Sequence, residues 1–179
     1  MTKAEAFLRQ AASDFSIYER LEQQRQYVPL CHRLHYLQMA TEKLAKAAAL
    51  RGDPDADIYN HIAFTKPKFW QAIERQAPVI ADGLGYSPAA LRKSLVAMRP
   101  LSHEIENLSP DVMNRRHGSK GVTPNAEYPW EGRDSNGALT WLAPADHDFP
   151  ELSDLPTSVS GVRLVQLIKR LLDRFDRIF

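Results

Sequence analysis

The chain of 179 residues contains a single cysteine, Cys31, and carries a formal net charge of only +1. One thiol can form neither an intramolecular disulfide nor a cysteine-rich zinc site, and this usage fits a protein of the reducing cytoplasm. A charge near zero provides no global field to attract nucleic acid or an anionic membrane, so binding of either depends on a local patch. With one cysteine and a net charge near zero, the chain can bind a ligand only through local groups of residues.

The sequence also lacks long apolar runs and the common catalytic motifs rich in glycine or histidine. Charges interrupt the apolar positions of the first ten residues, so we expect neither a signal peptide nor a membrane-spanning helix there. Gly83 and Gly85 form too short a glycine run for nucleotide binding and are typical of a helix end. We therefore predict no cofactor and no association with a membrane.

Apolar residues recur every three or four positions in several stretches, and this spacing predicts amphipathic helices. Thr2 and Glu5 have the spacing of a capping box that begins the first helix. The other helical stretches cover residues 30–52, 65–83, 87–108 and 160–179. We predict one all-α domain over residues 1–179, an up-down bundle of four to five main helices.

Prolines and charges refine this prediction at three places. Pro29 suits the first turn of the second helix, and the short connection before it predicts that the first two helices lie antiparallel. Pro100 lies inside the fourth stretch, where its ring and its missing N–H should kink or break the helix. Asp173 and Asp176 interrupt the basic face of the last helix, so we expect that helix to dock on the bundle rather than on a membrane.

Helical periodicity disappears in residues 109–158, which contain six prolines and four glycines. A long irregular segment is uncommon in a compact domain and is usually functional or disordered. Its large apolar side chains favour an ordered segment packed on the helices. Asn136 and Gly137 fit the tight turn of a short β-hairpin. We predict a long, mostly irregular insertion before the last helix.

Arg99 and His103 are the candidate catalytic residues. If the helix continues past Pro100, their side chains lie on one face, near Glu106 and Asn107. A guanidinium can hold a phosphate and an imidazole can transfer a proton, which are the two tasks of RNA cleavage without a metal. The alternative interpretation is a charged stripe on a solvated helix face.

Two segments of the insertion are candidate nucleic-acid contacts. The run from Asn114 to Lys120 brings basic side chains together, and it could contact phosphates or form a solvated loop tip. The segment from Asn125 to Trp130 could stack on a base, or act as a strap pinned to the core by its aromatic residues. The residues assigned to nucleic-acid binding are Arg115, Arg116, His117, Lys120, Asn125, Tyr128 and Trp130.

Two groups of potential metal ligands have more ordinary interpretations. His32 and His35 lie one helical turn apart beside Cys31, but no acidic residue has the spacing to complete a site. Asp146 and Asp148 flank His147, and such a triplet is typical of local hydrogen bonds in a turn. We therefore predict no metal at either group.

The string from Gln38 to Ala47, QMATEKLAKA, resembles the signature of HEPN domains, helical bundles named for nucleotide binding in higher eukaryotes and prokaryotes. Ala11, Asp14 and Tyr18 on the preceding helix resemble the usual HEPN opening. The resemblance covers about residues 4–108, with the terminal helix as a last member. It implies a bundle of four or five helices that often forms homodimers.

The resemblance also implies one of three functions: metal-independent ribonuclease, partner of a nucleotidyltransferase, or noncatalytic binding module. In the ribonucleases an Arg and a His, separated by four to six residues, lie on a late helix at a dimer cleft; here three residues separate Arg99 from His103. We expect binding of RNA or a nucleotide, in a toxin–antitoxin or defence setting, with an antitoxin or nucleotidyltransferase as candidate partner. The alternative is a noncatalytic protein-interaction module that uses the insertion and the last helix.

Overall fold

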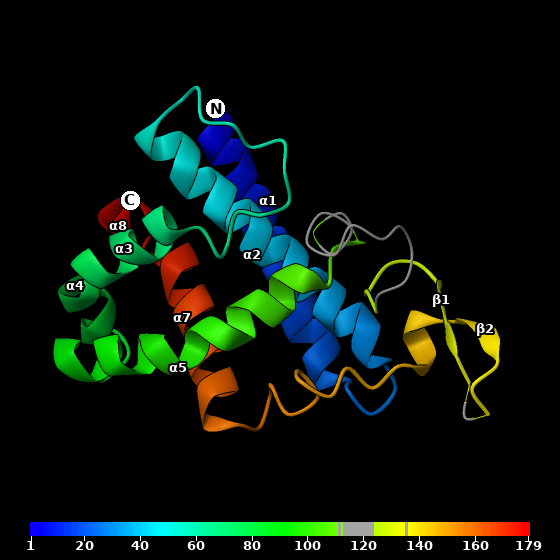
Figure 1. Cartoon of the computed structure of the whole chain (residues 1–179). Coiled ribbons are helices and arrows are strands. Elements are labelled where there is room, and N and C mark those ends of the chain that lie inside the picture. Colours follow the sequence, from blue (N-terminus) through cyan, green and yellow to red (C-terminus); the bar gives the residue numbers. More distant parts are fainter. Residues whose placement is uncertain (111, 113–123, 135) are drawn as a thin grey trace.

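The computed structural model describes residues 1–110, 112, 124–134 and 136–179 (Figure 1). This part of the chain is mainly α-helical, as predicted. The first half contains α1 (Lys3–Gln23), α2 (Leu30–Gly52), α3 (Pro67–Arg75), α4 (Ala77–Asp82) and α5 (Pro88–Asn107). The second half contains β1 (Trp130–Arg133), β2 (Leu139–Leu142), the short 3₁₀ helix η1 (Pro144–Asp146), α7 (Val159–Asp173) and α8 (Phe175–Ile178).

The two longest helices, α1 and α2, pack antiparallel along most of their length, as predicted (Figure 1). The capping box at the start of α1 is also confirmed. The Thr2 hydroxyl accepts a hydrogen bond from the Glu5 N–H, and the Glu5 carboxylate accepts one from the Thr2 N–H. Between the helices, Lys43 Nζ donates to the buried Asp14 carboxylate over 2.6 Å. A charge pair therefore joins the first helix to the second.

Residues 65–83 form two short helices instead of the single helix that the periodicity predicts. α3 ends at Arg75 and α4 begins at Ala77. The cause is Pro78, which has no N–H for the Glu74 carbonyl and whose ring would clash with that carbonyl in a continuous helix. The apolar positions are nevertheless buried as predicted: Phe69, Trp70, Ile73, Ala77 and Ile80.

Pro100 does not break the fourth helix, because α5 runs from Pro88 to Asn107 without interruption. A proline at position 100 deprives the Val96 carbonyl of its helical N–H donor. Pro100 and Val96 both lie on the exposed side of α5, where water can satisfy that carbonyl. The helix begins as predicted after Ser87, whose hydroxyl accepts a hydrogen bond from the Ala90 N–H over 3.1 Å.

The described part of the insertion contains the predicted hairpin. β1 pairs antiparallel with β2, and Trp130 lies opposite Leu142. Gly137 has a φ of +81°, a backbone conformation that glycine adopts without strain. The Asp134 carboxylate accepts hydrogen bonds from the N–H groups of Asn136 and Ala138 and so closes the turn. This small sheet is an addition to the otherwise helical architecture.

The last helices complete one hydrophobic core that includes side chains from α1 to α8. α7 docks on the bundle as predicted, with Leu164, Leu167, Ile168 and Leu171 buried. Gly161 at its start lies directly against the backbone of Leu155, where a Cβ would overlap the Leu155 carbonyl group. Within the described residues, no helix combines the length and the apolar character needed to cross a membrane.

Candidate functional site

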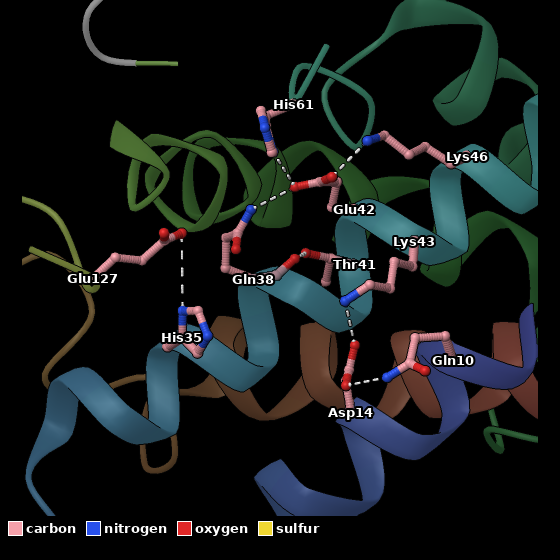
Figure 2. Close-up of polar contacts among 10 residues, drawn as sticks. All are labelled: Gln10, Asp14, His35, Gln38, Thr41, Glu42, Lys43, Lys46, His61 and Glu127. Carbon is pink, nitrogen blue, oxygen red and sulfur yellow. Dashed lines mark hydrogen bonds and ion pairs between the residues drawn. The ribbon is translucent and has the colours of Figure 1, made fainter. Parts of the chain in front are cut away.

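Four polar side chains follow one face of α2: His35, Gln38, Glu42 and Lys46, which we call the α2 polar row (Figure 2). Spacings of three and four residues place them on the same side of a helix. Gln38, Glu42 and Lys46 are all buried, and Gln38 is only 2% exposed. Charged side chains are seldom buried without partners, because leaving water costs them several kcal/mol. The row must therefore be held by specific contacts.

The Glu42 carboxylate is the centre of these contacts. It accepts hydrogen bonds from Lys46 Nζ over 2.6 Å and from Gln38 Nε2 over 2.9 Å, and it lies 2.9 Å from His61 Nδ1 (Figure 2). Burial raises the pKa of Glu42, but the hydrogen bonds from Lys46 and His61 outweigh burial, so the pKa is lowered. His61 belongs to the irregular segment between α2 and α3. The carboxylate thus stays ionised and ties that segment to α2.

A second buried carboxylate, Glu106 on α5, faces the same segment. It accepts hydrogen bonds from the N–H groups of Ala63 and Thr65 over 2.9 and 3.1 Å, and from the Thr65 hydroxyl. From the sequence, Glu106 was expected on the same helix face as Arg99 and His103. The structure directs its side chain into the interior instead. Residues 61–65 are consequently held by carboxylates from two helices.

The segment from Asn125 to Trp130 lies against the first turns of α2. The Asn125 side-chain oxygen accepts hydrogen bonds from the N–H groups of Glu127 and Tyr128 over 2.9 and 2.7 Å. Glu127 Oε1 lies 3.9 Å from His35 Nδ1 (Figure 2). Trp130 is 2% exposed, which leaves its ring no free face and favours the strap interpretation. Tyr128 is 62% exposed, so its ring is accessible for stacking.

The candidate catalytic residues Arg99 and His103 both lie on the exposed side of α5. The Arg99 guanidinium forms an ion pair with Glu74 on α3 and lies 5.8 Å from the centre of the Trp70 ring. A carboxylate on the guanidinium competes with any phosphate for the same N–H groups. Four of the proposed nucleic-acid contacts lie outside the described residues: Arg115, Arg116, His117 and Lys120.

Two of the candidate metal ligands, His35 and His147, have other contacts in the structure. His147 Nδ1 accepts a hydrogen bond from the Phe149 N–H over 2.9 Å, which confirms the turn interpretation of this triplet. The His147 ring also packs between the rings of Trp130 and Phe149. In the part of the chain that the structure describes, no three His, Cys, Asp or Glu side chains are grouped as metal ligands.

A cleft of about 750 Å³ opens beside Lys46, at the end of the α2 polar row. Its volume lies in the range of sites for small molecules, roughly 300–1,000 Å³. Lys66, Lys68 and Arg75 line it from α3 and the residue before that helix, and we call them the α3 wall. The apolar lining includes Ala45, Ala49, Phe69, Ala72 and Phe179.

The α3 wall carries three positively charged side chains at the cleft, which Asp53 and Asp57 also line. Lys66, Lys68 and Arg75 form no ion pair with another described residue, whereas Lys46 is paired with Glu42. Unpaired cations at a cleft are complementary to phosphate groups. The rings of Phe69 and Phe179 stack beside them, with centroids 5.5 Å apart and planes 13° apart. Phe69 is 6% exposed and Phe179 is only partly buried, so an apolar group could contact Phe179 while an anion binds beside it.

Neither this cleft nor the contact between Glu42 and His61 was predicted from the sequence. Lys68 and Arg75 are seven residues apart, and this spacing does place them on one helix face. No sequence signal indicates that the aperiodic segment 53–66 forms the opposite side, or that His61 reaches Glu42.

The residues that resemble the HEPN string divide between two faces of α2. Gln38, Glu42 and Lys46 form the polar row, and Lys43 contacts Asp14 of the resembling opening helix. Comparison of the chain with protein-family models, curated proteins and solved structures finds no match.

Proposed function

We propose that the protein is a HEPN-like module that binds a nucleotide, either free or at the end of an RNA strand. The observation that carries the proposal is the positive charge of Lys66, Lys68 and Arg75, which no other described residue pairs, beside a cleft of suitable size. The resemblance of α2 to the HEPN string supports it separately. A free nucleotide and a strand end share the phosphate, sugar and base that the cleft would receive.

The lining suggests how such a ligand would lie. Its phosphate would bind the α3 wall, because ammonium and guanidinium groups form charge-assisted hydrogen bonds with phosphate oxygens. Its base would cover the apolar surface around Phe179 and Ala72. Asp53 and Asp57 line the same cleft, and their carboxylates can accept hydrogen bonds from sugar hydroxyls.

The buried carboxylates have a positioning role in this proposal. Glu42 and Glu106 hold residues 61–65, and Ala63 of this segment lines the cleft together with Asn60, the residue before it. Lys46 reaches the cleft with its charge already compensated by Glu42. We therefore assign phosphate binding to the α3 wall and not to the polar row.

Binding, rather than cleavage, is the proposed activity because the candidate phosphate-holding residue Arg99 is paired with Glu74. A ribonuclease at Arg99 and His103 would have to displace that carboxylate before it could hold a phosphate. The antitoxin or nucleotidyltransferase partner implied by the resemblance is compatible with a binding module, since such a partner would provide the chemistry.

Fluorescence anisotropy with a labelled nucleoside diphosphate and with a labelled 5′-phosphorylated RNA tests the proposal. We expect the pair Lys66→Glu and Arg75→Glu to weaken binding at least about tenfold, which corresponds to about 1.4 kcal/mol. The control pair, Arg92→Glu and Lys93→Glu, reverses two exposed charges of α5 that do not line the cleft, and should leave affinity unchanged.

Two results would contradict the proposal. Unchanged affinity of the α3-wall variant would show that the phosphate binds elsewhere. An equal loss in both charge-reversal pairs would indicate nonspecific attraction, which should also weaken steeply as salt is added. Comparison of the two probes distinguishes a free nucleotide from a strand end.

A further inference from the structure

The hairpin of β1 and β2 lies at the periphery, on the opposite side of the molecule from α3 and α4 in Figure 1. One face of β2 carries two large apolar side chains in solvent: Leu139 is 73% exposed and Trp141 is 68% exposed. Across the strand pair, Arg133 lies opposite Leu139 and Glu131 opposite Trp141. Exposed apolar side chains gathered on one strand are typical of an interaction surface.

The outer edge of β2 also has unused hydrogen-bonding groups. The Asp134 N–H donates to the Ala138 carbonyl over 3.0 Å, so these residues form a hydrogen-bonded pair of the ladder. Such pairs alternate along antiparallel strands, and Gly132 with Thr140 is the next one. Leu139 and Trp141 therefore direct their N–H and C=O groups away from β1, where the described residues provide no third strand.

The sequence of β2 leaves this edge unprotected. Strand edges exposed to solvent are usually blocked by charged residues, proline or a bulge, which prevent pairing with another chain. Residues 139–142 are Leu-Thr-Trp-Leu and contain neither charge nor proline. A two-stranded sheet is in addition marginally stable unless further strands or a packing surface support it.

We propose that the β2 edge pairs with the β2 edge of a second copy of this chain, antiparallel and centred on Thr140. Residues opposite each other in a sheet must lie on the same face. If the twofold axis passes through Thr140, Leu139 lies opposite Trp141 of the other copy, and both side chains are on the same face of the sheet. The outward N–H and C=O groups of these two residues then form the hydrogen-bonded pairs. The result is a four-stranded sheet with twofold symmetry.

The β2 edge and its exposed face are complementary to a second copy of themselves, which favours that copy as the partner. Across the four strands of the exposed face, the side chains in each row would be Arg133 and Leu139 of one copy, followed by Trp141 and Glu131 of the second copy. An apolar pair lies at the centre of every row, and opposite charges lie at its two ends. This arrangement matches the apolar core and polar rim of protein interfaces, and one surface serves both copies.

Sedimentation equilibrium over a range of concentrations tests the pairing. We expect the mass of the parent to rise from 20.3 kDa toward twice that value, and the pair Leu139→Lys and Trp141→Lys to stay at 20.3 kDa. Both side chains are exposed, so these changes place like charges opposite each other without disturbing the core. The control pair, Tyr27→Lys and Val96→Lys, alters two exposed apolar residues elsewhere and should behave like the parent.

A cysteine at the symmetry axis tests the register. Thr140 would face its own copy in a non-hydrogen-bonded pair with Cα atoms about 4.5 Å apart, within the range of disulfides. Oxidised Thr140→Cys should form a covalent dimer, whereas Arg133→Cys on the outer strand should not. The native Cys31 is buried and does not compete.

Three results would overturn the proposal: a parent that stays monomeric at its highest soluble concentration, a dimer that survives both lysine substitutions, or equal cross-linking of the two cysteine variants. The proposal would also be overturned if the parent stays monomeric and its β2 edge binds an extended segment of a different protein.

Discussion

Glu42 is the residue on which the α2 polar row depends. Its replacement by Ala leaves Lys46 buried without a counter-charge, and we expect a loss of about 3–5 kcal/mol in the free energy of unfolding. Urea denaturation provides the measurement. Glu19→Ala is the control, because it removes a solvent-exposed pair with Lys169 and should cost no more than about 1 kcal/mol. Similar losses in the two variants would show that the row is not held as described.

The ionisation of Glu42 predicts how stability depends on pH. Its pKa in the folded protein lies below the usual value of 4.5, so the unfolded chain binds the proton more tightly. The stabilisation is therefore complete above pH 4.5 and is lost as the pH falls through the lower folded pKa. Urea midpoints measured from pH 7 downward should fall more steeply for the parent than for Glu42→Gln. Identical profiles would assign the acid sensitivity to other groups.

The ribonuclease hypothesis for Arg99 and His103 has its own test. Since Glu74 occupies the Arg99 guanidinium, we expect the purified protein to leave single-stranded RNA intact. His103→Ala should then match the parent on a denaturing gel. Cleavage by the parent that disappears in His103→Ala would restore the catalytic interpretation and contradict the assignment of binding alone.

Among the helices, the spacing of apolar residues predicted the structure correctly wherever no residue inside the stretch disfavours a helix. α1 and α2 occupy the predicted stretches because each has a continuous apolar stripe, and the Thr2 side chain also caps α1. The last predicted stretch is helical too, but it is divided at Arg174 into α7 and α8. Periodicity failed at Pro78, where one missing N–H outweighs a good apolar pattern. At Pro100 the helix continues despite the proline, because the Val96 carbonyl that loses its N–H donor lies on the exposed side of α5.

The candidate site was less accessible to sequence reasoning than the helices. Gln38, Glu42 and Lys46 were recognisable as a string, but their burial was not, since it depends on α5 and on segment 53–66 packing above them. His61 and the Asp57 side of the cleft come from residues with no periodicity. Only the folded chain brings them to α2.

The junction between the insertion and α7 provides an element-scale prediction. In Gly161→Ala the new methyl group would overlap the Leu155 carbonyl, and the backbone must shift at a cost of about 1–3 kcal/mol. Gly52→Ala is the matched control, because nothing lies within 4 Å of its Cβ position. Thermal unfolding should give a lower Tm for Gly161→Ala and a Tm equal to or above the parent for Gly52→Ala. Equal losses would contradict the close packing at Leu155.

At the scale of the whole molecule, the two proposed surfaces are separate. The cleft lies between α2, α3 and the C-terminal residues, whereas the hairpin lies on the opposite side in Figure 1. Pairing of two copies through β2 would therefore leave both clefts open.

Nucleotide binding and dimerisation should accordingly be independent. The pair Leu139→Lys and Trp141→Lys should remove dimers without changing the affinity for a labelled nucleoside diphosphate. The pair Lys66→Glu and Arg75→Glu should lower that affinity and leave dimerisation unchanged. Anisotropy and sedimentation on the same preparations provide the comparison. Loss of nucleotide affinity in the hairpin variant would show that the two surfaces are coupled.

An NMR titration of the ¹⁵N-labelled protein with a nucleoside diphosphate locates nucleotide binding residue by residue. Binding at the cleft predicts that the largest chemical-shift changes occur at the amides of Lys66, Lys68 and Arg75 and at the C-terminal residues that line the same cleft. Changes confined to the exposed side of α5 around His103, or the absence of any change at saturating ligand, would contradict it.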